Sequence, residues 1–595
     1  MNSNINTAFE ASNARDFSST QLVNEFIWTE SFSELLYSSK NQVVLGSRGS
    51  GKTALIKMLS HQNICKYAKR SCDYLDINEK ENVQKALKIV NEKSLIATYV
   101  PLKVEWINSL DNYSDSKQSY FVWSLNLATC ARLIDTAVSC TEEYLKDEVQ
   151  TTLIQRKICK ELSELWALPC SVNNFTDLIN QLTNIEFKKS LIFNKEAMDI
   201  ELEPEDKKLG LAFHSSLFSP FTIATKVVSK YLKIPNTSKW VLCLDEAEFL
   251  SKAHHQILNT HMRSANDIFF KITTMPYRHH TLSTTVESQI NVGHDLEYVY
   301  IDKLGTINMN QTASDTAIEK FAAKLFRNRL MQVDYGSVLE LEQLVGFSKL
   351  SQDTTDLTSN EELLDLIEIH CNEATFTRAK RLFSDDTDRF NNEIARKLRG
   401  ILLLRDEYHN RIGSSNTPLY SGTSIISRCS DGNPRRLFRL FNHLLNGDKT
   451  STKITPETQS KRLKSFSYSE LEVIKFEKGG KSAFSFVQTI GFYFKERTLE
   501  QKLGSDLPQA ITIKGSINDV YWEAIKSAVD LGLMYPVVKK DTNHKNLFPS
   551  KEGDFCLAGC LAPHFNLFPR VGKAIDIVSI LNPKMEDEQL RLFHE

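Results

Sequence analysis

The sequence predicts an α/β protein built on a parallel sheet, and three observations predict this class. Four short apolar runs, residues 42–45, 240–244, 268–272 and 298–301, have the length and composition of buried strands. Helix-forming stretches separate these runs, and strands that alternate with helices are typical of parallel sheets. A glycine-rich segment, Gly46–Gly51, joins the first run to a helix-forming stretch. Residues 95–106 are a further β-rich run, broken by Pro101.

Composition limits the kinds of protein that this chain can be. Lys and Arg total 72 against 74 for Asp and Glu among 595 residues, so a nucleic acid would need a local basic patch. The 11 cysteines lack the spacing of a disulfide framework, which favours reduced thiols. The N-terminus lacks the features of a signal peptide, and no apolar run approaches the length of a membrane span. We therefore expect a cytoplasmic protein without membrane contact.

The glycine-rich segment carries the first functional signal. The residues Gly46, Ser47, Arg48, Gly49, Ser50, Gly51, Lys52 and Thr53 match the pattern G-x-x-x-x-G-K-[ST] of a P-loop. Glycines let the backbone curl so that several N–H groups point at phosphate oxygens, and the following helix presents its positive end to the same charge. Lys52 can then reach the β- and γ-phosphates, and the Thr53 hydroxyl can ligate Mg²⁺. The alternative is a glycine-rich turn without a ligand.

An acidic strand end supplies the second half of the expected nucleotide site. The apolar run 240–244 ends in Asp245 and Glu246. We expect this strand to neighbour the strand of the P-loop, with Asp245 holding Mg²⁺ and Glu246 polarising the attacking water. The pair is a weak signal alone, since many strands end in acids, but a strong one beside a P-loop.

Two other P-loop classes do not fit the sequence. It has no Asn-Lys-x-Asp guanine reader where a small GTPase carries one, and no Leu-Ser-Gly-Gly-Gln signature of transporter-type ATPases. The expected ligands are therefore ATP and Mg²⁺. An Asp-Glu strand end also fits hydrolysis better than phosphoryl transfer to a second substrate.

The order of these motifs resembles that of AAA+ ATPases of the origin-recognition clade and their bacterial relatives. In that clade a segment ahead of the P-loop packs on adenine, which the resemblance assigns to residues 13–27, with Phe26 and Ile27 against the base. A polar residue caps the strand at 268–272 and senses the γ-phosphate. The resemblance assigns this role to Thr274 in the pair Thr273–Thr274, where the clade usually has Asn.

Two arginines complete the site that the resemblance implies. Arg435, in the segment 431–437, takes the place of the sensor 2 arginine, whose guanidinium contacts phosphate. A second reading makes the same segment a helix start, with Asn433 as N-cap and Pro434 as the first helical residue. Arg278 is the candidate for an arginine that acts on a neighbouring subunit, and its alternative is a surface arginine beside a turn.

The resemblance also implies a domain order. It gives an AAA+ core over residues 1–310 with a helical insertion at about 108–233, an all-α lid over 311–475 and a winged helix over 476–595. In the winged helix, a helix at 522–531 precedes a β-wing, with Lys539, Lys540, His544 and Lys545 at its tip. These charges can grip DNA phosphates, or they can simply be solvated.

Three functions stay open at this point. The first is an oligomeric ATPase that switches or remodels DNA or an effector protein. Bacterial relatives of the clade occur in anti-phage defence loci, so the resemblance suggests a defence role. The second is a STAND-type signalling NTPase whose nucleotide state controls oligomerisation without DNA binding. The third is a scaffold that holds nucleotide without turnover, against which Glu246 argues.

Overall fold

The computed structural model describes most of the chain. The described residues are 9, 14, 16–71, 75–104, 106, 115–197, 201, 203, 208–265, 267–286, 288–303, 311–332, 340–348, 350, 359–410, 418–445, 453–504, 507–515, 517–537 and 549–581. They form two compact units. The first, here the core unit, comprises Asn13–Leu45 and Lys52–Val299; the second, the C-terminal unit, comprises Met1–Ser12, Gly46–Gly51 and Tyr300–Glu595.

A five-stranded sheet is the centre of the core unit. Its strands are β1 (Asn41–Leu45), β2 (Leu95–Pro101), β3 (Lys239–Asp245), β4 (Ile268–Thr274) and β5 (Leu296–Tyr300), in the order β2-β3-β4-β1-β5. The β2–β3, β3–β4 and β4–β1 pairs are all parallel, which confirms the predicted parallel sheet. Every residue of β1 is buried, as the apolar run predicted.

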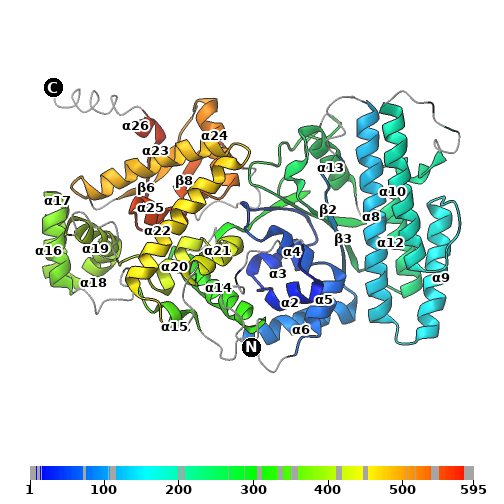
Figure 1. The fold of residues 1–595 in the computed structure, drawn as a ribbon, viewed down its shortest axis with the longest axis horizontal. Coiled ribbons are helices and arrows are strands. Elements are labelled where there is room, and N and C mark those ends of the chain that lie inside the picture. Colours follow the sequence, from blue (N-terminus) through cyan, green and yellow to red (C-terminus); the bar gives the residue numbers. More distant parts are fainter. Residues whose placement is uncertain are drawn as a thin grey trace. The chain divides into compact units, whose positions relative to one another are not determined.

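Six shorter helices accompany this sheet. They are α2 (Ser19–Glu25), α3 (Glu30–Tyr37), α4 (Lys52–Met58), α5 (His61–Ala68), α6 (Ile77–Glu92) and α13 (Lys252–Ser264) (Figure 1). Local sequence fixes where several of them begin. Asp76, for example, accepts a hydrogen bond from the N–H of Glu79, whose side chain accepts one from the Asp76 N–H, a reciprocal cap that starts α6. Between β3 and α13, a 3₁₀ turn spans Ala247–Phe249.

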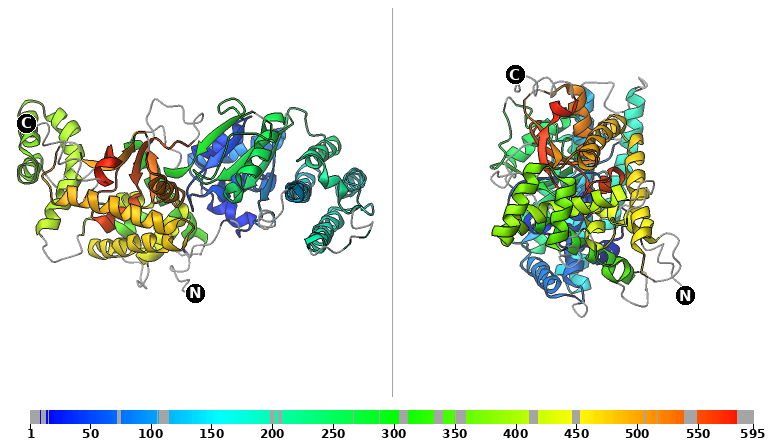
Figure 2. Two further views of the ribbon diagram at one scale, coloured as in Figure 1. Left: turned by 90° about the horizontal axis from the view of Figure 1, so that it is seen from above. Right: turned by 90° about the vertical axis from the view of Figure 1, so that its left-hand side faces the viewer.

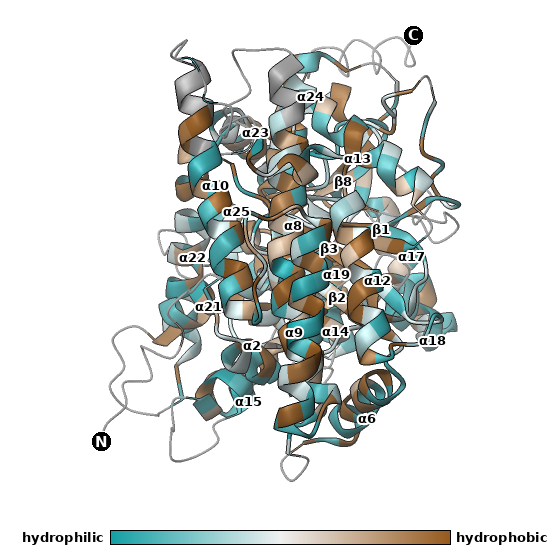
Figure 3. Cartoon of the chain, turned by 90° about the vertical axis from the view of Figure 1, so that its right-hand side faces the viewer, coloured by the Kyte–Doolittle hydropathy of each residue, from teal (hydrophilic) through white to brown (hydrophobic). Residues whose placement is uncertain are grey.

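Four helices form a block in the region that the sequence predicted to be helical, and its status as an insertion stays a prediction. These are α8 (Asp115–Tyr144), α9 (Glu148–Leu165), α10 (Phe175–Ala197) and α12 (Ser219–Leu232), with a 3₁₀ turn at Leu211–His214. Figure 2 shows the block from two further directions. Both α9 and α10 carry apolar and polar residues along their length (Figure 3). They also leave large apolar side chains exposed, namely Val149, Leu153, Leu165, Phe187 and Leu191.

The C-terminal unit begins with a series of helices. They are α14 (Gln311–Gln332), α15 (Leu341–Val345), α16 (Asn360–His370), α17 (Glu373–Asp385), α18 (Thr387–Arg389), a π-helical turn (Phe390–Ala395), α19 (Arg396–Asn410), α20 (Thr423–Ser430) and α21 (Pro434–Leu445). The rest of this unit contains α22 (Pro456–Val473), α23 (Gly480–Leu499), α24 (Asp519–Asp530), α25 (Ala562–Phe565) and α26 (Ile577–Leu581).

A second, four-stranded sheet lies among these last helices. Its strands are β6 (Pro508–Ile513), β7 (Met534–Val537), β8 (Gly553–Leu557) and β9 (Lys573–Asp576), in the order β7-β8-β6-β9. The β7–β8 and β6–β8 pairs are antiparallel, and the β6–β9 pair is parallel. The expected wing tip, with Lys539, Lys540, His544 and Lys545, lies outside the described residues.

Candidate functional site

The glycine-rich loop connects β1 to α4. Gly49 has φ +83° and Gly51 has φ +94°, values that side-chain-bearing residues rarely adopt. A Cβ atom on Gly49 would also come within 2.9 Å of the Arg435 Cβ. Both glycines are therefore needed for the observed path of the chain. The helix α4 begins directly at Lys52, whose side chain is buried, and the Thr53 side chain is half-buried in the same turn.

Asp245 is held rigidly at the end of β3. It is fully buried, and its two carboxylate oxygens accept hydrogen bonds from different strands. The Tyr99 hydroxyl donates to Oδ2 at 2.9 Å, and the Thr273 hydroxyl donates to Oδ1 at 2.5 Å. Charge-assisted hydrogen bonds of this kind are stronger than neutral ones, so the carboxylate keeps one orientation.

Glu246 follows Asp245 in a left-handed backbone conformation, with φ 66° and ψ 39°. Its backbone N–H donates to Asp245 Oδ1 at 3.1 Å and to Thr273 Oγ1 at 3.0 Å. A left-handed residue other than glycine costs on the order of 1 kcal/mol and persists only where its surroundings hold it. These two hydrogen bonds hold the turn at the end of β3.

The order of the strands corrects one expectation. The acidic strand β3 does not neighbour β1, because β4 pairs with both of them. The C-terminal end of β4 consequently lies between the acidic pair and the start of the loop, where Thr274 stands opposite Leu45. Thr273 is engaged with Asp245, whereas the buried Thr274 hydroxyl has no hydrogen-bond partner among the described residues. Of the two, Thr274 is thus the threonine whose hydroxyl is not engaged within the described residues, and its role as the γ-phosphate sensor stays a prediction.

A second acid, Glu248, shares this region with the loop lysine. Burial raises the pKa of Glu248, while the positive charges of Lys52 and Arg278 lower it in part. The negative charge of Asp245 acts on the same carboxyl group. Lys52, Asp245 and Arg278 therefore lie close enough to one carboxyl group to influence its titration. The half-buried Arg278 therefore lies near Glu248 of its own chain.

On the side of the C-terminal unit, the start of α21 contacts the loop. Asn433 Nδ2 donates to the Arg48 carbonyl at 3.0 Å, and the Arg435 N–H lies 3.4 Å from the Gly49 carbonyl. Asn433 Oδ1 also accepts from the Arg436 N–H at 3.1 Å, so it caps the helix as the second reading predicted. The helix-start reading is therefore confirmed, and the phosphate contact of Arg435 stays a prediction.

The two arginines at the start of α21 have different surroundings. Burial lowers the pKa of the half-buried Arg435, and the charges of Arg48 and Arg439 lower it further. Arg436 is instead fully enclosed. It forms ion pairs with Asp431 at 2.9 Å and Glu470 at 3.4 Å, and donates to the Gly532 carbonyl at 2.8 Å. Arg435 is therefore the arginine beside the loop, and Arg436 joins α21 to α22 and the α24–β7 turn.

Three further groups of the C-terminal unit hold the loop. The Asp302 carboxylate accepts from the Ser47 N–H at 2.9 and 3.0 Å and from the Ser47 hydroxyl at 2.6 Å. The Arg48 N–H donates to the Asp530 carbonyl at 2.9 Å, and the Arg48 side chain pairs with Glu477. The first half of the loop is thus fixed by residues that lie far away in the sequence.

The segment expected to meet adenine is described only in part. Phe26 is buried and packs edge-on against Phe32, with ring centroids 4.7 Å apart, and the following Ile27 is half-buried. Asn13 and Arg15 lie outside the described residues. Lys57 of α4 donates to the Phe17 carbonyl at 2.9 Å, so this segment is tied to the helix that follows the loop.

Sequence reasoning missed two groups of the core unit that act on the strand-end acids, Tyr99 and Glu248, and two groups of the C-terminal unit that contact the loop, Asp302 and Asp530. Tyr99 and Asp302 had a usable signal, because each lies at or just beyond the C-terminal end of a strand, where parallel strands gather their functional groups. Glu248 lies two residues after the expected base. Asp530 contributes only a backbone carbonyl, which no sequence pattern indicates.

Comparison with known proteins adds one finding. The family model described as ORC-CDC6-like matches residues 7–577, nearly the whole chain. A search of curated proteins found no match. Among the described residues, no helix is both long and apolar enough to cross a bilayer.

Proposed function

The chain belongs to the ORC-CDC6-like family, a family of AAA+ ATPases, and from this premise we propose that it binds ATP with Mg²⁺ and hydrolyses it to ADP and phosphate. One observation carries the proposal. The charges of the loop lysine Lys52 and of the strand-end acid Asp245 both act on the carboxyl group of Glu248, which supports a site to which both contribute.

Each residue has a role in this proposal. The loop amides and Lys52 bind the phosphates, and the Thr274 hydroxyl donates to the γ-phosphate or the attacking water. Glu246 accepts the proton of that water. Arg435 binds phosphate. Its charge is disfavoured by burial and by two neighbouring arginines, and an anion relieves both effects.

The residues present fit a magnesium ion. Mg²⁺ keeps several waters and needs only one or two protein ligands besides the phosphates. The Thr53 hydroxyl and the oriented Asp245 carboxylate supply such ligands. When bound, Mg²⁺ offsets the negative charge that gathers on the phosphates during transfer.

The larger organisation is part of the same proposal. Residues 1–310 form the ATPase core, 311–475 the lid and 476–595 a winged-helix-like domain. The protein acts as a homo-oligomeric switch or remodeller on DNA or on an effector protein, in a defence setting.

Arg278 is the candidate for an arginine that completes a neighbour's site, although its effect on Glu248 equally supports a role within its own subunit. The alternative remains a STAND-type NTPase that switches its oligomeric state without DNA.

Nucleotide binding is tested by changing Lys52 to Ala. This variant is expected to lose ATP binding, because the loop then lacks the cation that balances the phosphates. Titration with a fluorescent ATP analogue measures the affinity. The control is Lys66→Ala, which removes an exposed lysine of α5 and should bind ATP like the wild type. Equal affinities in the two variants would contradict the proposed site.

DNA binding is tested at the wing. Changing Lys539, Lys540 and Lys545 together to Glu should weaken binding to all DNA sequences alike. It should also flatten the dependence of log K on log salt by about 0.9 for each DNA phosphate that the wing no longer neutralises. The control changes three exposed lysines of α6, Lys80, Lys85 and Lys88, to Glu. If neither set of changes alters DNA binding, or if the wild type does not bind DNA with ATP present, the STAND-type signalling NTPase becomes the favoured function.

A further inference from the structure

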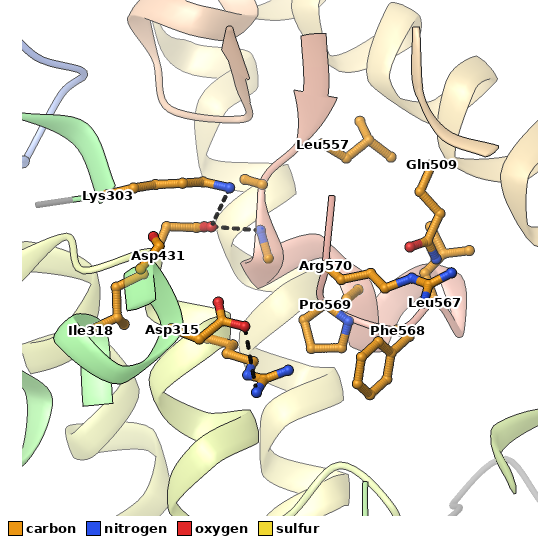
Figure 4. A pocket seen from close by; sticks show the side chains of 15 residues that line it. Lys303, Asp315, Ile318, Asp431, Gln509, Leu557, Leu567, Phe568, Pro569 and Arg570 are labelled. Carbon is orange, nitrogen blue, oxygen red and sulfur yellow. Dashed lines mark hydrogen bonds and ion pairs between the residues drawn. The ribbon is translucent and has the colours of Figure 1, made fainter. Parts of the chain in front are cut away.

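A small cavity within the C-terminal unit lies apart from the loop, and nothing above assigns it a role. It has a volume of about 30 Å³ (Figure 4). Its lining comes from Lys303, α14, the end of α20 with Asp431 after it, β6, residues 557–559 at the end of β8, Ala562 of α25 and residues 567–570. The side chains of Gln509 and Arg570 converge on one side of it, and those of Asp315 and Asp431 lie on the other. Arg428 also lines the cavity and pairs with Asp315.

Polar atoms without hydrogen-bond partners gather at this cavity. Gln509 is only 4% exposed, yet in the described part of the chain neither its amide nitrogen nor its amide oxygen has a partner. The Nε atoms of Arg428 and Arg570 are buried and lack hydrogen-bond partners among the same residues. Each such atom costs about 1–3 kcal/mol unless something binds it. Four of them at one cavity indicate a polar occupant.

The charges around the cavity favour a negative occupant. Asp315 is paired with Arg428 at 3.4 Å, and Asp431 with Arg436 at 2.9 Å. Asp431 also accepts from the Gly559 N–H at 3.0 Å, so both lining carboxylates are committed to protein partners.

Arg570 is the cation in excess. Its Nη1 donates to the Lys397 carbonyl, and no carboxylate within the described ranges pairs with it. Burial lowers the pKa of Arg570 to about 10, and the charge of Arg396 acts in the same direction. The Arg570 side chain is half-buried, and a partly desolvated guanidinium that meets a second cation and no carboxylate within the described ranges is disfavoured, which a bound anion would offset.

We propose that this cavity binds a small oxyanion of the phosphate class, held by Arg570, the Arg428 Nε and the amide of Gln509. A buried water takes about 10–15 Å³ of such a cavity, so the space admits about two waters or one compact anion in their place. A guanidinium presents several N–H donors to an oxyanion at once, which suits phosphate better than chloride. The site is separate from the loop and does not depend on ATP binding.

An anion bound in this cavity would contact elements that lie far apart in the sequence. Asp431, with φ 55°, links α20 to the segment that carries Arg435, and it also binds the β8 end through Gly559. An anion that joins Arg428 of α20 to Gln509 of β6 would therefore stabilise the junction between the helices and the small sheet.

The test uses full-length protein that carries Lys52→Ala, so that phosphate binding at the loop does not interfere. Inorganic phosphate is titrated by calorimetry and by thermal shift, with chloride at equal ionic strength as the reference. Phosphate is expected to bind and to raise the melting temperature. Adding Arg570→Ala should weaken binding at least about tenfold, the effect of losing one charge-assisted interaction. Adding Arg381→Ala, which removes an exposed arginine of α17, should change nothing.

A second variant separates binding from folding. Adding Gln509→Leu removes the unpartnered amide, so in chloride alone the protein should melt at or above the temperature of its parent. Phosphate should nevertheless bind to this variant at least about tenfold more weakly. A parallel titration with glycerol phosphate shows which kind of phosphate the cavity binds. If glycerol phosphate binds more tightly than inorganic phosphate, the ligand is the phosphoryl end of a larger molecule. If it binds more weakly, the ligand is the free ion. Absence of binding to the parent, or equal binding in the Arg570 and Gln509 variants, would show a cavity that holds water only.

Discussion

Changing Glu246 to Gln is expected to reduce ATP hydrolysis by about 10²–10⁴-fold while ATP affinity stays close to that of the wild type. Glutamine has the size of glutamate but cannot accept the proton of the attacking water, and the contribution of a positioned general base lies in this range. The backbone turn at this position is held by the Glu246 N–H, which the substitution retains. Single-turnover hydrolysis and equilibrium ATP binding, measured on the same preparation, check the two parts.

Glu248→Gln is the control for this experiment. Glu248 lies two residues further along, and burial raises its pKa, so it is an acid close in the chain that could compete for the role of base. We expect a smaller loss of rate from Glu248→Gln than from Glu246→Gln. The opposite ranking would transfer the role of base to Glu248, and equal rates in the wild type and Glu246→Gln would remove Glu246 from the mechanism.

Changing Arg436 to Met is expected to lower the free energy of unfolding by about 3–5 kcal/mol. The substitution leaves Asp431 and Glu470 buried without this guanidinium, and breaking a buried ion pair from one side carries a cost of that size. The Gly532 carbonyl also loses its donor. Urea unfolding followed by tryptophan fluorescence measures the change, and Trp522 of α24 reports on the C-terminal unit.

The adjacent arginine provides a matched control. Arg435→Met removes a guanidinium one residue away, but this one has a lowered pKa and lies beside Gly49 of the loop. Its unfolding free energy should stay within about 1 kcal/mol of the wild-type value, while its ATP affinity or hydrolysis rate falls. An Arg436→Met protein as stable as the wild type would show that the buried network is dispensable.

The sequence predicted the core sheet well and the second sheet poorly, for a physical reason. The core strands are buried on both faces, so β1 and β3 stand out as apolar runs. In the second sheet, β9 is only four residues long, and two of these are the charged Lys573 and Asp576. Its assignment as a strand depends on pairing with β6, which lies some distance away in the sequence and leaves no periodic signal.

In the candidate site, too, some features could be predicted from the sequence and others could not. Lys52, Thr53 and Asp245 could be predicted because phosphate and Mg²⁺ chemistry requires those residue types at those spacings. The order of the strands could not, since the sequence does not say that β4 pairs between β1 and β3. The partners of Asp245 also depend on this order, because Tyr99 and Thr273 reach it only once β2 and β4 flank β3.

The contacts of the loop with Asp302 and Asp530 also have a consequence for biosynthesis. A ribosome finishes residues 46–51 early, but the carbonyl that accepts from the Arg48 N–H belongs to a residue near the other end of the chain. At a translation rate of about 5–20 residues per second, Asp530 is synthesised on the order of half a minute or longer after the loop. Until then the nascent chain has the loop sequence without the contacts that fix its first half. The finished arrangement of the loop is therefore reached only after nearly the whole chain has been made.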